Sequence, residues 1–150
     1  MDDNIVSTPK FVAFIIAFLM LVALLIINDD GFIRIIDDAN VLFHEAGHLI
    51  FGLFGDTMGL YGGTLGQLAF PIIFAVAFWL QHSSVSAAVA LLWLFENFFN
   101  IAGYIATTTK PGVYFMVGGG EHDWSSILSR WDALQYDATL ATIVRVMGWL

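Results

Sequence analysis

The sequence HEAGH, residues 44–48, places two histidines four positions apart within an otherwise apolar stretch. On an α-helix, His44 and His48 would lie on one face, one turn apart, so both imidazoles can bind the same metal ion. Glu45 would lie close to that ion, where a carboxylate can take a proton from metal-bound water. The motif therefore predicts a zinc site that activates water. The alternative is that the two histidines hydrogen-bond to neighbouring helices, with Glu45 as their ion-pair partner.

A catalytic zinc ion normally has three protein ligands and one open position, so the motif needs a third ligand. The segment GGGEHDW, residues 118–124, offers two candidates, because its glycines allow the backbone to fold back closely. His122 or Asp123 could complete the site, and the other could orient a ligand from behind. Alternatively, this segment is a turn that caps the following helix. Further candidate ligands are Glu96, within an apolar run, and His82 and Glu121, in polar segments.

Two asparagines, Asn97 and Asn100, lie one helical turn apart in a later apolar segment. A neutral amide directed at the metal could hydrogen-bond a developing oxyanion, which makes both residues candidate catalytic groups. Hydrogen bonding between helices is the alternative interpretation.

The composition is that of an integral membrane protein. Of 150 residues, 59% are hydrophobic and only 12% are charged, outside the range of ordinary soluble domains. Membrane lipids are therefore expected partners. The net charge of −8 argues against nucleic acid as a partner. The chain has no cysteine, which excludes disulfides, thiolate nucleophiles and cysteine-ligated metals.

Hydrophobic periodicity predicts an all-α bundle in a single membrane domain, residues 1–150. The expected transmembrane helices are 11–28, 41–55, 66–80 and 85–106, followed by an amphipathic helical region, 124–150, at the interface or against the bundle. The glycine-rich stretch 55–66 is expected to be a turn between helices, or a place where backbones approach closely.

The positive charges predict an orientation. With four spans and a cytoplasmic N-terminus, four of the five Lys and Arg residues fall on the cytoplasmic side, as the positive-inside rule favours. That arrangement places the GGGEHDW segment on the cytoplasmic side, whereas His44 lies nearer the outer end of its helix. These two placements are compatible with one metal site only if the GGGEHDW segment re-enters the membrane or if helix 41–55 does not span it.

Taken together, FHEAGH in a hydrophobic helix, the following GGTLGQ, the segment ENFFNIAGY and the closing GGGEHDW resemble site-2 proteases, the M50 group of intramembrane zinc metallopeptidases. The resemblance covers about residues 41–131. It implies a protein of the bacterial inner membrane in which His44, His48 and Asp123, or the adjacent His122, bind zinc. It also implies that Glu45 activates water to cut a transmembrane protein substrate.

The chain departs from that family in two ways. The usual family aspartate lies in a Leu-Asp-Gly sequence, which is absent here, so the HDW tripeptide must replace it. A PDZ-type substrate-recognition domain is also absent. The alternative function is therefore a non-catalytic metal-binding subunit of a larger membrane complex, built on a protease-like scaffold and held to partner subunits. A metal-dependent membrane oxidoreductase or transporter, which would need His82 and Glu96 at the same metal, is a more distant alternative.

Overall fold

The computed structural model describes residues 6–28, 33–110 and 122–150, and these residues form helices and no strand. The long helices are α1 (Thr8–Ile27), α2 (Arg34–Gly52), α3 (Asp56–Leu80) and α4 (Ser84–Ala106). Shorter elements follow: α5 (Asp123–Arg130), a 3-10 helix η1 (Leu134–Tyr136) and α6 (Asp137–Met147). The prediction of an all-helical chain is confirmed.

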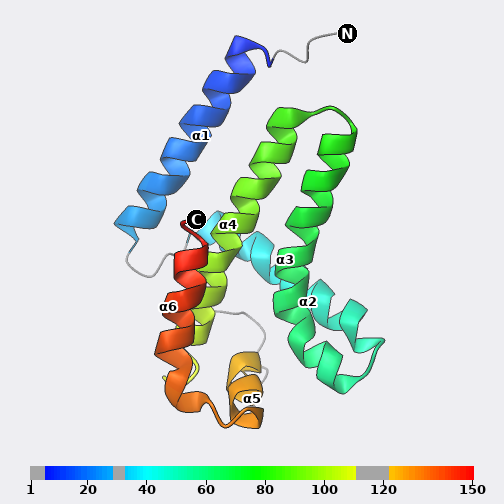
Figure 1. Cartoon of the computed structure of the whole chain (residues 1–150), viewed down its shortest axis with the longest axis vertical. Helices are drawn as coiled ribbons and strands as arrows, with labels where there is room; N and C mark the ends of the chain where they lie inside the picture. Colours follow the sequence, from blue (N-terminus) through cyan, green and yellow to red (C-terminus); the bar gives the residue numbers. More distant parts are fainter. Residues whose placement is uncertain (1–5, 29–32, 111–121) are drawn as a thin grey trace.

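Helices α3 and α4 form an antiparallel hairpin, with α6 alongside α4 and α1 on the outer side of α4 (Figure 1). The N-terminal end of α1 lies at the same end of the hairpin as the loop that joins α3 to α4. Helix α2 crosses the hairpin and packs most extensively against α3. A small apolar core between α4 and α6 contains Ile101, Ile105 and Ala141.

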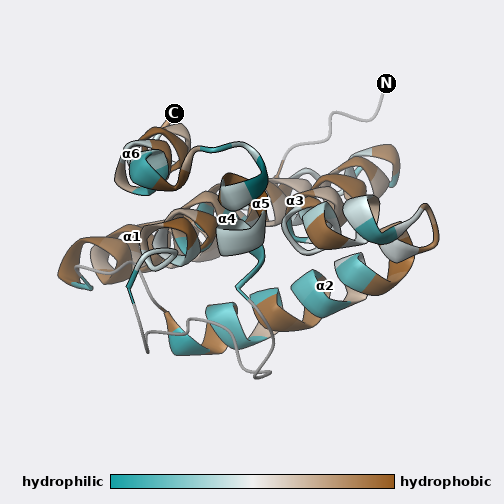
Figure 2. Ribbon diagram, turned by 90° about the horizontal axis from the view of Figure 1, so that it is seen from below, coloured by the Kyte–Doolittle hydropathy of each residue, from teal (hydrophilic) through white to brown (hydrophobic). Residues whose placement is uncertain are grey.

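Three helices, α1, α3 and α4, are long and apolar enough to cross a membrane. Helix α2 overlaps the predicted span 41–55 but begins earlier and ends at Gly52. It is not among these three, because four charged residues lie along it. Figure 2 shows the contrast: α1 is mostly hydrophobic, whereas hydrophilic and hydrophobic segments alternate along α2. The chain is therefore a membrane protein with three candidate spans in its described part.

Helix α3 begins at Asp56, so most of the glycine-rich stretch expected as a turn belongs to a helix. Glycine disfavours helices because it loses much conformational freedom, and this penalty argued for a turn. Packing against α2 decides otherwise, since glycines let two helix backbones approach closely. The turn itself is short and contains Gly55, whose φ of +106° suits glycine and strains other residues.

The C-terminal region predicted as amphipathic helix consists of α5, η1 and α6. Helix α5 packs beside the first half of α3, where Trp124 donates a hydrogen bond to Thr64 and Trp131 donates one to Tyr61. Helix α6 packs along α4 and contributes Ala141 to the core. These contacts place the start of α5 close to α3 and to α2, the helix that carries the HEAGH motif.

Candidate metal centre

The two motif histidines lie on the face of α2 that is turned toward α3. His44 is buried and His48 is half-buried, and their ring centroids are 4.7 Å apart. This is the arrangement expected for residues four positions apart on a helix.

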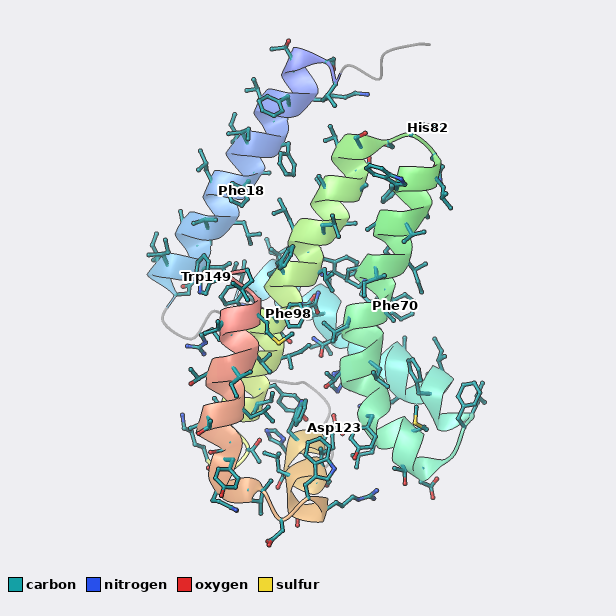
Figure 3. All side chains as sticks on the ribbon, in the orientation of Figure 1. Phe18, Phe70, His82, Phe98, Asp123 and Trp149 are labelled. Atoms are coloured by element: carbon teal, nitrogen blue, oxygen red, sulfur yellow. The ribbon has the colours of Figure 1, made fainter. Side chains whose placement is uncertain are left out.

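Asp123, the first residue of α5, joins this pair from far along the chain. Its Oδ2 lies 2.8 Å from Nε2 of His44 and 3.2 Å from Nε2 of His48. One ligand atom from each of the three residues lies within 4.8 Å of the others, so the group could hold a metal ion. Figure 3 shows Asp123 at the end of the α3–α4 hairpin opposite His82.

The glycines of α3 create the space for these side chains. A Cβ on Gly63 would overlap the imidazole of His44, and one on Gly66 would lie 2.6 Å from the carbonyl oxygen of Phe43. A Cβ on Gly47 of α2 would overlap the backbone of Gly62. The contact between α2 and α3 is therefore backbone against backbone, and Gly63 provides the space that the first histidine occupies.

Hydrogen bonds determine which ring nitrogen of each histidine faces Asp123. Nδ1 of His48 lies 2.7 Å from the carbonyl oxygen of Gly59, which can only accept, so this nitrogen carries a proton. In the neutral ring, Nε2 is then an unprotonated lone pair directed at Asp123.

A longer series of hydrogen bonds determines which ring nitrogen of His44 carries the proton. The carbonyl oxygen of Trp93 can only accept, so it bonds the amide nitrogen of Asn97 and leaves Oδ1 of Asn97 facing Gln67. Gln67 donates to this oxygen and, at 2.8 Å, to Oδ1 of Asn100. Its own oxygen therefore lies toward His44, 2.9 Å from Nδ1, and accepts the Nδ1 proton.

The three converging atoms thus form a donor set that needs a cation. Two imidazole lone pairs and a carboxylate are all acceptors, so they can be held this close only by a proton or a metal ion that lies between them. Holding the second ring nitrogen of a histidine by an acceptor is a common feature of protein metal sites, because it orients the ligand. The residues present therefore fit a divalent metal ion.

In the metal-free group, a proton takes the place of the ion between His48 and Asp123. The hydrogen bond to Asp123 raises the pKa of His48 to about 9, although burial acts in the opposite direction. Burial alone would raise the pKa of Asp123, but the hydrogen bonds from His44 and His48 outweigh it and hold that pKa well below its usual range. The negative charge of Glu45 also raises the pKa of His48, so Glu45 lies near enough to act on the group.

The other predicted site residues lie outside the group of His44, His48 and Asp123. Glu45 is exposed on α2 and lies next to His44 in sequence. Asn97 and Asn100 are buried behind Gln67, and their amide nitrogens donate to the carbonyl oxygen of Trp93 and to the carboxylate of Asp37 respectively. The hydrogen bonds of both asparagines thus run between and within helices, the alternative interpretation of this pair.

His122 lies outside the His44–His48–Asp123 group, although it is adjacent to Asp123 in sequence. Its ring stacks on Tyr104 at 4.1 Å, and Nε2 lies 3.1 Å from the hydroxyl of Thr107. Burial lowers the pKa of His122. Glu96 is buried too, but it bonds Asn40 and not the cluster. Glu121 lies outside the described residues.

Sequence reasoning missed two residues that hold the site. Gln67 orients His44, and Tyr104 accepts a hydrogen bond from the backbone N–H of Asp123 at 3.1 Å while its hydroxyl lies 3.4 Å from Oδ2. A signal for Gln67 was present, because an uncharged polar side chain within an apolar helix usually has a partner to bond. Tyr104 follows Asn97 and Asn100 along one stripe of α4, which already indicated a polar face.

Comparison with known proteins gives no family for this chain. No family model, no curated protein and no solved structure matches it.

Proposed function

We propose that this protein is a zinc-dependent peptidase that hydrolyses a peptide bond in a membrane-embedded or juxtamembrane segment of another protein. The single observation that carries the proposal is the convergence of His44, His48 and Asp123, with the second nitrogen of each histidine held by an acceptor. Two histidines and one aspartate are also the ligand set implied by the resemblance to site-2 proteases.

The number of ligands favours catalysis over a purely structural metal site. Structural zinc sites are closed by four protein ligands, whereas catalytic sites keep a position open for water or substrate. The part of the chain that the structure describes provides three ligand residues in this group. When bound, zinc would act as a Lewis acid and lower the pKa of water to about 7.

Each residue of the site then has a definite role. His44, His48 and Asp123 bind the ion, while Gln67 and the carbonyl of Gly59 keep both rings in the ligating tautomer. The exposed carboxylate of Glu45 accepts a proton from the attacking water and returns it to the nitrogen of the departing amine. Asn97 and Asn100 act through Gln67 and not on the substrate.

The arrangement also suggests which side of the membrane carries the site. If α1, α3 and α4 each cross once, Lys10 lies on one side, and Arg34, Lys110, Arg130 and Arg145 lie on the other. The positive-inside rule then places the metal site on the cytoplasmic side and the N-terminus outside, the reverse of the orientation expected from four spans. It also puts α2 and α5 on one side, which removes the conflict noted for four spans. A bacterial inner membrane is proposed from the resemblance alone.

The orientation can be tested directly because the chain has no cysteine. Single cysteines at Ser7 and at Ser126 should react with a membrane-impermeant maleimide from opposite sides of the membrane. Labelling of both positions in intact cells would contradict three crossings.

Metal analysis and hydrolysis test the function together. The purified wild-type protein should contain one zinc ion per chain, and His48→Ala and Asp123→Ala should contain almost none. His122→Ala, next to the ligand but outside the group, is the matched control and should retain the metal. With labelled peptides that copy apolar segments as substrates, Glu45→Gln should keep the zinc and lose about 10²–10⁴-fold in rate.

Two results would overturn the peptidase proposal. Hydrolysis by Glu45→Gln at the wild-type rate would remove this residue as the base. A stoichiometric zinc ion without hydrolysis of any of the peptides would favour the non-catalytic metal-binding subunit instead.

A further inference from the structure

A second site lies away from the metal centre, between α1, α4 and the C-terminal end of the chain. A cavity of about 300 Å³ opens there. Most of its wall is apolar and includes Phe18, Leu21, Leu92, Phe95, Phe99 and Trp149. Figure 3 labels Phe18 on α1 and Trp149 near the end of α6, the two sides of this space. The cavity therefore lies between two candidate membrane spans, where lipid-like molecules have access.

One carboxyl group interrupts the apolar wall. Glu96 lines the cavity, and its side chain is 1% exposed. Its Oε2 accepts a hydrogen bond of 2.9 Å from the amide of Asn40, whereas Oε1 has no hydrogen-bond partner among the described residues. A buried polar atom without a partner is costly, and a bound molecule that donates a hydrogen bond would remove this cost.

We propose that this cavity binds an uncharged, single-chain amphiphile whose hydroxyl group donates a hydrogen bond to Oε1 of Glu96. The apolar residues of α1 and α4 would surround the alkyl chain. The volume is at the lower end of the range of about 300–1,000 Å³ that is typical of small-molecule sites, so one chain fits better than two.

The charge of the wall selects the class of ligand. No lysine or arginine lines the cavity, so a phosphate or carboxylate head group would meet Glu96 without a compensating cation. A pure hydrocarbon would leave Oε1 without a partner. A hydroxyl group satisfies that oxygen without adding charge.

The site is connected to the metal centre but does not depend on its activity. Asn40, which bonds Glu96, lies one helical turn before His44 on α2. Occupancy of the cavity can therefore be measured in protein that hydrolyses nothing, and failure of the peptidase proposal would leave this one intact.

Photolabelling in nanodiscs of phosphatidylcholine tests the proposal. The probe is hexadecanol carrying a diazirine on its chain, and mass spectrometry identifies the labelled peptides. Labelling should be confined to the segments of α1, α4 and the C-terminal end that line the cavity. Unlabelled hexadecanol should compete at concentrations about tenfold lower than hexadecane or palmitate, the effect of about one hydrogen bond.

Two substitutions separate the cavity from general lipid contact. Leu21→Trp fills the space and should reduce labelling about tenfold, whereas Ile16→Trp, on the lipid-exposed side of the same helix, should not change it. Glu96→Leu should abolish the preference for hexadecanol over hexadecane. Thermal unfolding and zinc content of each variant confirm that it is folded.

Three outcomes would overturn the proposal. Labelling that does not saturate, or that Leu21→Trp leaves unchanged, means contact with bulk lipid only. Equal competition by hexadecane means that Glu96 does not select the ligand. Crosslinks between α1 of one copy and α4 of another that persist in the presence of the probe would show that a second copy of the chain fills the space.

Discussion

The contrast between helices α1 and α2 shows which interactions hold this bundle together. Helix α1 is hydrophobic from residue 11 to its end (Figure 2), yet none of its residues is buried within the protein. Helix α2 carries four charged residues, yet it packs most extensively on α3 and buries Asp37, Asn40, His44 and Gly47. The more polar helix is the one that buries residues within the protein.

The physical reason is that lipid is as apolar as leucine, so apolar side chains alone give little net drive for two helices to associate in a membrane. Small residues allow close van der Waals packing, and polar side chains gain hydrogen bonds that lipid cannot supply. Helix α2 has glycines and buried polar side chains, whereas residues 11–27 of α1 include neither a glycine nor a polar side chain. Substitutions in the two helices should therefore have very different effects.

The largest effect is expected where two backbones touch. Gly47→Ala places a methyl group against the carbonyl of Gly62, so α2 and α3 must move apart. This should lower the free energy of unfolding by about 1–3 kcal/mol. Gly52→Ala is the matched control, because its Cβ would meet Gly59 at 4.0 Å, an ordinary contact. Unfolding of both variants in mixed micelles measures the difference. Equal stability of the two would refute close packing at Gly47.

A smaller effect is expected from the side chain that orients His44. Gln67→Leu removes the acceptor of the Nδ1 proton, and loss of such a partner typically lowers metal affinity about 10–100-fold. Gln67→Glu keeps an acceptor at the same place and should lose less. Competition with a zinc chelator measures both affinities. If Gln67→Leu and Gln67→Glu weaken zinc binding equally, the hydrogen bond between Gln67 and His44 does not contribute to zinc affinity.

Proton competition should weaken metal binding gradually as the pH falls. In the metal-free protein the hydrogen bond to Asp123 raises the pKa of His48 to about 9, so below that pH a proton must leave before the metal binds. Apparent zinc affinity should fall with decreasing pH, by about tenfold per unit for each proton released. Calorimetric titrations in buffers of different ionisation enthalpy would count the protons, and an affinity that is constant between pH 9 and 6 would contradict this order of events.

The smallest effect is expected in α1. Leu19 is 58% exposed, so Leu19→Ala removes contact with lipid and little contact with protein. Unfolding free energy should change by less than about 0.5 kcal/mol. A loss comparable to that of Gly47→Ala would mean that α1 packs against something other than lipid, and the contrast between the two helices would fail.

Much of the local structure could be predicted from the sequence. Long apolar runs specify helices because their backbones must satisfy all their hydrogen bonds internally in a membrane, and α1 and α4 lie where these runs predicted them. The four-residue spacing in HEAGH likewise puts His44 and His48 on one face, because the helical repeat of 3.6 residues is a local property.

The start of α3 could not be predicted from local signals. Four glycines in eight residues, 59–66, indicated a turn by propensity, and only the presence of α2 across from them makes a helix the better choice. What glycine loses in conformational freedom is offset by the close contact that a missing side chain permits.

The sequence alone thus determined the helices and the pair of histidines, since both follow from interactions between residues a few positions apart. Only the tertiary structure decided that Asp123 faces these histidines while His122 stacks on Tyr104. Adjacent residues at the start of a helix point in different directions, and which one meets α2 depends on how α5 packs against α3 and α4. That packing joins segments almost eighty positions apart, and no local pattern encodes it.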